Sequence, residues 1–182
     1  AAASRLAAAG RDVSLIQILT GDERDFPFDQ GYRFNDPETG AQLVRADLKD
    51  KRSLLAACTG VDAVISTVSM IGTGQVGDSF DTTDRDGTKA LIDAAKNSGV
   101  KKFVFVSFDT TRFPDAPLTR AKREAEEHLK RSGLDYTILH PSLFFESWLG
   151  PMLFADAAAG TAKVYGRGTQ KLRYVAVADV AE

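Results

Sequence analysis

The chain has 182 residues, 43% hydrophobic and 26% charged, a composition typical of one globular domain. Lysine and arginine total 23 against 25 for aspartate and glutamate, so the formal charge of -2 argues against a nucleic-acid-binding surface. One cysteine excludes an internal disulfide, and with only two histidines a Cys/His zinc site is not expected. The apolar runs are far shorter than the ~18 residues of a membrane span, and no secretory signal is recognisable, so we expect a cytoplasmic protein without a membrane partner.

Strands and helices alternate from the start of the chain. Residues 1–9 favour a helix without a preceding cap, and Gly10 is typical of a helix end, so the chain is expected to begin inside a helix. The next predicted elements are a strand over Val13–Leu19, a loop with weak helix over Thr20–Gly40, a short strand over Gln42–Ala46, a helix over Lys49–Cys58 and a strand over Asp62–Val68. The last of these is apolar on both faces, as in the middle of a parallel sheet.

The same alternation continues in the second half. The predicted elements are a helix over Asp84–Ser98, a strand over Lys102–Ser107, a helix over Pro117–Ser132, a strand over Asp135–Leu139, mixed helix over Phe144–Ala159 and a strand over Lys171–Val177. In the helix over 117–132, the spacing of Lys122 and Glu126 predicts a surface ion pair. The pattern predicts an α/β fold with a doubly wound, mostly parallel Rossmann-like sheet, covered on both faces. Such sheets bind ligands at the carboxyl ends of their strands.

A glycine-rich motif, Gly-Thr-Gly-Gln-Val-Gly, occupies residues 72–77, directly after the predicted strand over 62–68. Such glycines can bring backbone amides close to a pyrophosphate at a helix N-terminus. No helix is predicted to begin at Gly77, however, and four aspartates follow between residues 78 and 86, where they would repel a diphosphate. We therefore interpret the motif as a mobile loop of small residues.

Four sequence blocks together resemble the NmrA-like, atypical branch of the short-chain dehydrogenase/reductase superfamily. They are Leu43–Leu48 followed by Ser53–Leu54, then Gly60–Val68, then Asp86–Lys96 with Gly99–Ser107, and finally Lys122–Glu126 with Ser132–Pro141. The resemblance implies a single NAD(P)-binding Rossmann-like domain over 1–182, truncated at both ends, in which 143–182 begin a substrate-side region. The first strand of the family and its Gly-rich phosphate loop are expected to be absent. In the strand order 3-2-1-4-5-6, that first strand would separate the predicted strands over 13–19 and 62–68.

The chain departs from the family in its catalytic pattern. In the family's Tyr-x-x-x-Lys motif the lysine is kept as Lys122, but Leu118 stands at the tyrosine position. Ser107 is kept after its strand, whereas Phe108 replaces the second serine of many members. The basic residue that often selects a 2′-phosphate would fall near Ile18, so both NAD and NADP remain possible cofactors.

The resemblance also implies a set of cofactor contacts near the strand ends. They are Asp47, Leu48, Ser66, Thr67, Val68, Lys122, Pro141, Ser142 and Phe144. Asp47 either accepts a hydrogen bond from the adenine amino group or caps a helix or turn. Residues 66–68 either pass under the ribose or simply end a strand. Residues 141–144 either line the nicotinamide or form a turn, with Phe144, Phe145 and Trp148 in the core.

Lys122 and Ser107 are the candidate catalytic residues. An ammonium near the nicotinamide ribose can hold two hydroxyls and, without the tyrosine, exchange a proton with the substrate. The alternative for Lys122 is a surface lysine paired with Glu126. Ser107 either polarises a substrate carbonyl or packs at a strand end. Of the two histidines, His140 is expected to be buried and His128 to lie on a solvated face.

Together these features predict an NAD(P)-binding oxidoreductase that transfers hydride between nicotinamide and a small carbonyl, imine or alkene substrate. The loss of the tyrosine and the presence of Phe108 favour one alternative, a non-catalytic NAD(P)-sensing regulatory protein. A third possibility is a structural subunit that keeps the fold but has lost binding. The expected partners are the dinucleotide and a small-molecule substrate, and no metal is expected. The sequence does not indicate the oligomeric state.

Overall fold

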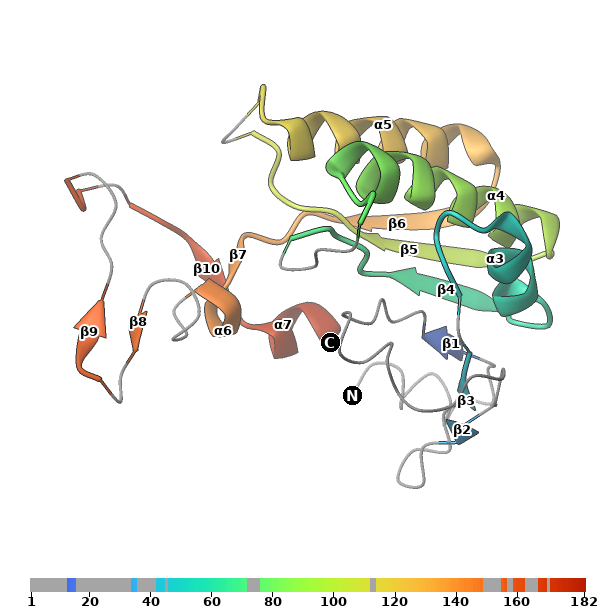
Figure 1. Cartoon of the computed structure of the whole chain (residues 1–182), viewed down its shortest axis with the longest axis horizontal. Coiled ribbons are helices and arrows are strands. Elements are labelled where there is room, and N and C mark those ends of the chain that lie inside the picture. Colours follow the sequence, from blue (N-terminus) through green and yellow to red (C-terminus); the bar gives the residue numbers. More distant parts are fainter. Residues whose placement is uncertain are drawn as a thin grey trace.

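The structure is a computed structural model, shown in Figure 1. It describes residues 13–15, 34–35, 42–44, 46–71, 76–111, 114–148, 155–156, 159–162, 167–169 and 171–182. Its main sheet contains four parallel strands in the order β1-β4-β5-β6. These strands are β1 (Val13–Leu15), β4 (Ala63–Ser66), β5 (Lys102–Val106) and β6 (Asp135–Leu139). Because they are parallel, their carboxyl ends meet at one edge of the sheet.

Three α-helices and one π-helical segment accompany this sheet. They are α3 (Lys51–Cys58), the π-helical η1 (Phe80–Gly87), α4 (Thr88–Asn97), which continues η1, and α5 (Pro117–Ser132). Figure 1 shows α4 and α5 side by side over one face of β4, β5 and β6. Helix α5 begins with Pro117, whose fixed φ suits a first turn, and ends at Gly133 in the left-handed conformation with a φ of 84°.

The hydrophobic core fills the space between this face of the sheet and helices α4 and α5. Phe103 and Phe105 alternate along β5 with no exposed surface, and they belong to one buried cluster with Leu91, Ile92 and Leu129. Burying each of these side chains stabilises the fold by about 1.5–3 kcal/mol. This cluster holds the helices on the sheet and thereby fixes where α5 presents its side chains.

The opposite face of β5 is less well covered. Lys102, Val104 and Val106 point that way and are half-buried. The sequence predicts burial of both faces, whereas the described helices α4 and α5 pack on one of them. Among the described residues, the predicted burial of the sheet is therefore confirmed for the face that α4 and α5 cover.

The predicted boundaries are confirmed where proline or glycine marks the end of an element. The helix over Pro117–Ser132 and the strand over Asp135–Leu139 have the predicted bounds. The helix predicted from Asp84 instead begins at Phe80, in η1. Ser79 caps it reciprocally: its hydroxyl accepts from Thr82 N at 3.0 Å, and Thr82 Oγ1 accepts from Ser79 N at 2.9 Å.

The first half of the sheet differs from the family's strand order. In the family order another strand would lie between β1 and β4, yet the two are direct neighbours, with Val13 opposite Ala63. This pairing satisfies the backbone groups of that edge of β4. The strand predicted over 42–46 is reduced to β3 (Gln42–Leu43), which pairs antiparallel with β2 (Phe34–Asn35) outside the main sheet. The helix predicted at the start of the chain lies outside the described residues.

The C-terminal part contains short elements. They are β7 (Leu143–Phe144), α6 (Phe145–Trp148), β8 (Ala155–Asp156), β9 (Thr161–Ala162), β10 (Tyr174–Val175) and α7 (Val177–Ala181). Strand β10 pairs in parallel with β7. The mixed helix predicted over 144–159 is thus only the single turn of α6 among the described residues. Phe145, predicted in the core, is 55% exposed and meets the Tyr174 ring edge-on.

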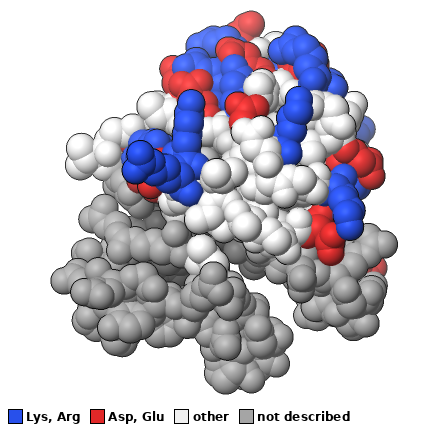
Figure 2. Space-filling model, turned by 90° about the vertical axis from the view of Figure 1, so that its right-hand side faces the viewer, with Lys and Arg blue, Asp and Glu red and all other residues white. Residues whose placement is uncertain are grey.

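Figure 2 shows the side of the molecule toward the amino ends of the main strands, where lysines and arginines alternate with aspartates and glutamates. Lys101 pairs with Asp62 at 2.8 Å, and Lys102 pairs with Asp135 at 2.9 Å. These pairs are exposed and contribute little stability each. The alternation of positive and negative side chains on this surface agrees with the near-zero net charge of the sequence.

Candidate functional site

The loops after β4, β5 and β6 leave the same edge of the sheet, and backbone hydrogen bonds join the segment after β5 to the end of β6. Ser107 N donates to Leu139 O at 2.9 Å, and Asp109 N donates to Pro141 O at 3.1 Å. At the end of β4, Ser66 is fully buried, and its hydroxyl has no hydrogen-bond partner in the described part of the chain. A buried hydroxyl without a partner is a polar group that a ligand can satisfy.

Lys122 reaches this edge from α5. Its ammonium donates to Val68 O, lies 3.1 Å from Asp84 Oδ1 and is 5.0 Å from the centre of the Phe105 ring. Only 4% of the side chain is exposed. Burial lowers the pKa of Lys122, and the Asp84 carboxylate opposes this shift without cancelling it. The alternative of a surface lysine paired with Glu126 is therefore wrong, because α5 packs this face against η1.

Asp84 is the partner of Lys122 and has no exposed surface. Its second oxygen, Oδ2, accepts from Met70 N at 3.0 Å. Asp84 therefore connects η1, the loop after β4 and α5 through one carboxylate. This role is not predictable from local sequence, because Asp84 and Lys122 are far apart in the chain.

The four aspartates that follow the glycine-rich motif do not form a field of like charge. Asp78 pairs with Lys49 at 2.7 Å, Asp81 and Asp86 pair with Arg85 at 2.6 and 2.7 Å, and Asp84 pairs with Lys122. Asp81 and Asp86 share Arg85, so three cations offset the four negative charges and weaken the expected repulsion of a diphosphate. Residues 72–75 of the motif itself lie outside the described residues.

A second polar cluster joins β5, α5 and the end of β6. Ser107 Oγ donates to Glu126 Oε1 at 2.6 Å, and His140 Nε2 lies 3.0 Å from the same oxygen. The side chain of Glu126 is 7% exposed, whereas that of His140 is 47% exposed. His140 was expected to be buried, and this expectation is wrong. Glu126 belongs to the site and was missed, since its position one turn after Lys122 suggested a surface pair.

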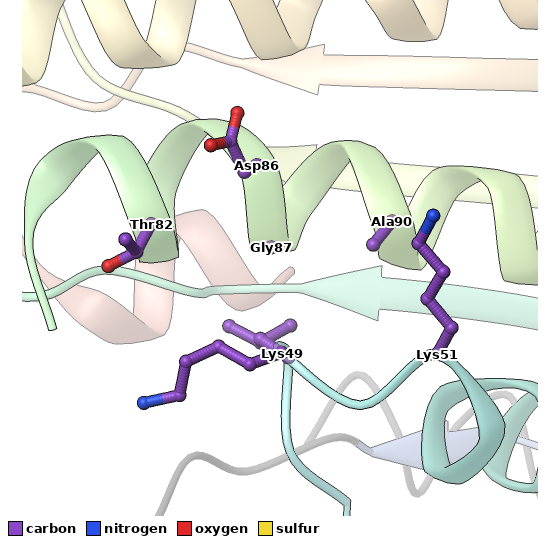
Figure 3. A pocket seen from close by; sticks show the side chains of 7 residues that line it. Lys49, Lys51, Thr82, Asp86, Gly87 and Ala90 are labelled. Carbon is purple, nitrogen blue, oxygen red and sulfur yellow. The ribbon is translucent and has the colours of Figure 1, made fainter. Parts of the chain in front are cut away.

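An open hollow of about 240 Å³ lies where α3 approaches η1 and α4 (Figure 3). It is lined by Leu48, Lys49, Lys51, Thr82, Asp86, Gly87 and Ala90. Gly87 allows the close approach of these elements, because a Cβ built there would lie 2.8 Å from Leu48 Cβ and 3.1 Å from Thr82 O. Its lining combines apolar Leu48 and Ala90 with the charged side chains of Lys49, Lys51 and Asp86.

Asp47 stands directly before this hollow. Its Oδ1 accepts from Lys49 N at 2.8 Å, which makes it a turn aspartate, while Asp50 caps α3 through Arg52 N at 3.0 Å. Asp47 is exposed, so its turn does not remove it from solvent. Its proposed contact with adenine stays a prediction.

The remaining predicted residues divide between two places. Pro141 is buried at the common edge beside Ser107. Ser142 donates its hydroxyl to Arg173 O at 2.6 Å, and half-buried Phe144 lies in β7 opposite Val175. Ser142 and Phe144 thus join the C-terminal strand pair to the end of β6. Thr67 is exposed and Val68 is buried at the end of β4.

Residues 30–182 match the family model described as NAD(P)H-binding. The chain belongs to this NAD(P)H-binding family. This agrees with the Rossmann-like, short-chain dehydrogenase/reductase resemblance and with NAD or NADP as the cofactor. The narrower NmrA-like assignment stays a prediction.

Two kinds of curated relative are similar to the chain. The photosystem II assembly factor Ycf39 of Cyanophora paradoxa is 41% identical over 62% of this chain and 35% of its own length. The NAD(P)H azoreductase of Xenophilus azovorans is 31% identical over 78% of this chain and 46% of its own. The chain therefore spans about a third to a half of the relatives that it matches.

Solved structures support the same fold. The NADPH-dependent quinone oxidoreductase QOR2 of Escherichia coli, complexed with NADPH, has a TM-score of 0.50 and 27% identity, covering 62% of this chain and 36% of its own. A Bacillus halodurans protein assigned to the NAD-dependent epimerases/dehydratases has a TM-score of 0.54 and 28% identity, covering 79% and 64%. Within the described residues, no helix is both long and apolar enough to cross a bilayer, and no three metal-ligating side chains gather.

The described residues fit a dinucleotide. The hollow beside Asp47 places apolar Leu48 next to the cations Lys49 and Lys51, a combination that suits a base flanked by phosphorylated sugar. Lys49 also pairs with Asp78, and Asp86 lines the same hollow. Ser66 supplies an unpaired buried hydroxyl at the edge where such ligands lie in open α/β sheets.

Proposed function

We propose that the protein is an NAD(P)H-dependent reductase of a small carbonyl, imine or alkene substrate. The observation that carries the proposal is the presence of two buried polar side chains, Lys122 and Ser107, at the carboxyl edge of the sheet. Each is held by a buried carboxylate, Asp84 and Glu126 respectively. Buried ionisable groups of this kind cluster at functional sites because burial is costly without a role.

The proposed cofactor contacts follow the strand ends. The adenosine half would lie over the hollow, against Asp47 and Leu48 and the backbone of residues 66–68. The nicotinamide half would lie near Lys122, with Pro141, Ser142 and Phe144 beside it. When bound, the reduced nicotinamide supplies the hydride. The chain contributes a fixed cation at Lys122, a hydroxyl at Ser107, and a buried edge that limits water.

Relatives support a reductase. The azoreductase and the quinone oxidoreductase both carry redox activities in their names, at 31% and 27% identity. We propose an oxidised, conjugated small molecule as the substrate class, which includes quinones and azo compounds. Localisation in the cytoplasm remains a prediction, and the 32% identical Arabidopsis thaliana relative is named as chloroplastic.

The test is NAD(P)H oxidation by purified protein with a panel of quinones, ketones and azo dyes. Ser107→Ala and Lys122→Met should each lower turnover, by about 10²-fold for loss of an acid–base or electrostatic group. Asp93→Asn, an exposed control on α4, should leave turnover unchanged. Turnover unaffected by both site variants would overturn the proposed roles.

A second candidate is an NAD(P)-binding assembly factor without turnover. Leu118 at the tyrosine position favours it, as does the 41% identity to a photosystem II assembly factor. The two candidates separate cleanly: a factor of this kind would quench or shift NADPH fluorescence on binding but oxidise no NADPH with any acceptor in the panel.

A further inference from the structure

We propose that Ser107, Glu126 and His140 form a proton path that carries a proton from solvent to the substrate. This inference rests on the proposed reductase function and names the proton donor that the reaction needs. The three side chains meet at a single atom, since Ser107 Oγ and His140 Nε2 lie 2.6 and 3.0 Å from Glu126 Oε1. The path runs from the exposed imidazole to the buried hydroxyl.

The direction of the serine hydrogen bond explains why a path is needed. Ser107 donates its hydroxyl proton to Glu126, so its oxygen presents only lone pairs to the site. A hydroxyl in this state accepts hydrogen bonds and cannot polarise a substrate carbonyl. Ser107 becomes a donor to substrate only when Glu126 carries a proton and donates it to Oγ. The protonation state of Glu126 therefore decides whether the Ser107 hydroxyl can donate a hydrogen bond to the substrate.

His140 is the group that can deliver this proton. Its side chain is 47% exposed, in contrast to 7% for Glu126, so it exchanges protons with solvent while contacting the buried carboxylate. Imidazole also titrates nearest to neutral pH among the side chains. Glu126 has no comparable exposure of its own, which makes His140 its connection to water.

Lys122 is poorly placed to be the proton donor. Its ammonium is directed at Val68 O and the Asp84 carboxylate, and only 4% of the side chain is exposed. Giving up a proton there would leave the buried Asp84 charge without its cation, which is costly. With Leu118 at the tyrosine position, Ser107 is the hydroxyl at this edge that is hydrogen-bonded to a buried carboxylate, that of Glu126.

The step balances as follows for a carbonyl substrate. When bound, a reduced nicotinamide would supply the hydride to the carbonyl carbon, whose double bond to oxygen would become a single bond. The carbonyl oxygen would take the Ser107 hydroxyl proton, Ser107 would take the proton of protonated Glu126, and Glu126 would take the Nε2 proton of the His140 imidazolium, which becomes a neutral imidazole. Solvent then reprotonates His140. An azo or imine nitrogen would take the proton in the same way.

Several charges face the path and belong in any pH profile. Lys122 and Lys130 both interact with Glu126 through space, and Asp84 neutralises Lys122. Lys122 and Asp84 are common to the variants below and remain in place. A change in the pH profile on removing His140 is therefore attributable to the path.

The kinetic test uses purified protein, NADPH and an acceptor that wild type reduces. His140→Ala should lower kcat by about 10²-fold at neutral pH, the usual effect of losing an acid–base group. Because position 140 is exposed, added imidazole should restore turnover in this variant. Glu126→Gln should be slow and should not respond to imidazole, because its amide cannot pass the proton on. His128→Ala is the matched control and should behave like wild type.

A second readout does not depend on turnover. The chain has two histidines, and each contacts one carboxylate: His140 meets Glu126, and His128 meets Asp93 at 2.7 Å. In ring ¹⁵N spectra, Glu126→Gln should move the His140 signals and leave those of His128 in place. Asp93→Asn should do the reverse. This comparison shows whether the imidazole–carboxylate contact exists in solution.

The outcomes separate the path from the proposed function. Absence of NADPH oxidation in wild type overturns the reductase proposal and, with it, the path. Wild-type turnover that His140→Ala does not slow overturns the path alone. A slow His140→Ala variant without imidazole rescue also overturns it, because a merely structural histidine would give that result. Rescue in His140→Ala but not in Glu126→Gln supports the path.

Discussion

The buried pair of Asp84 and Lys122 gives a sharp prediction for stability. Replacing Asp84 with asparagine keeps the shape and an acceptor for Met70 N, but it removes the negative charge 3.1 Å from the Lys122 ammonium. At that distance and an effective dielectric constant of about 20, the lost attraction is about 5 kcal/mol. Breaking one side of a buried pair typically costs about 3–5 kcal/mol. We expect Asp84→Asn to lower the free energy of unfolding by about 3–5 kcal/mol.

The assay is urea unfolding followed by far-ultraviolet circular dichroism, with two further variants. Asp86→Asn lies on the same segment, but the Asp86 side chain is 57% exposed, so its loss should cost at most about 1 kcal/mol. Adding Lys122→Met to Asp84→Asn removes the stranded cation and should recover part of the loss. A loss below about 1 kcal/mol in Asp84→Asn, equal to that in Asp86→Asn, would refute the pairing.

Two further predictions concern Gly87 and Cys58. Alanine is favoured over glycine in a helix by about 1 kcal/mol. Gly87→Ala should nevertheless destabilise the protein by about 1–3 kcal/mol, because the new Cβ would lie 2.8 Å from Leu48 Cβ. A rise in the thermal unfolding midpoint of this variant would contradict the close contact. Burial raises the pKa of the Cys58 thiol to about 11. This single cysteine should therefore react with a thiol reagent such as DTNB only after unfolding. Rapid reaction of the native protein at pH 8 would contradict the burial of Cys58. Because the folded state favours the neutral thiol, its stability should fall as pH rises from about 9 through 11, by on the order of 3 kcal/mol, and Cys58→Ala should remove that slope in urea titrations.

The sequence predicts elements well where local chemistry decides them. Pro117 and Gly133 delimit α5, and the apolar run after Asp135 defines β6, so both have the predicted bounds. The start of η1 was signalled by Ser79 and Thr82, whose capping pattern lies in the sequence but was not used. Predictions were least accurate for the short C-terminal elements, where few residues pair and local propensity is weak: of the strand predicted over 171–177, Tyr174–Val175 forms β10.

The site was only partly predictable because its key contacts are long-range. Lys122 and Glu126 lie on the stripe of α5 that also carries Ala125 and Leu129, so helical periodicity could have placed both inside. Their partners could not be deduced in that way. Nothing local to the helix indicates that Asp84 meets Lys122 or that His140 meets Glu126, since folding brings these segments together.

The relatives and the site favour different candidate functions. A photosystem II assembly factor is more similar in sequence than the azoreductase, whereas the Ser107–Glu126–His140 cluster, which links two buried side chains to an exposed imidazole, is the arrangement expected where a proton moves. A protein that only bound the dinucleotide would need the hollow and Ser66 but not an exposed histidine joined to a buried glutamate. The variants of Glu126 and His140 therefore also bear on which candidate function holds.

Chemical-shift mapping with NADPH tests most directly whether this chain binds its cofactor at the carboxyl edge of the sheet. The account predicts saturable shifts of the backbone amides of Leu48, Thr67, Val68 and Gly87, which surround the hollow and the end of β4. Amides at the amino ends of the strands, such as that of Lys102, should not move. Shifts confined to those amino ends, or no shifts at saturating NADPH, would contradict the account.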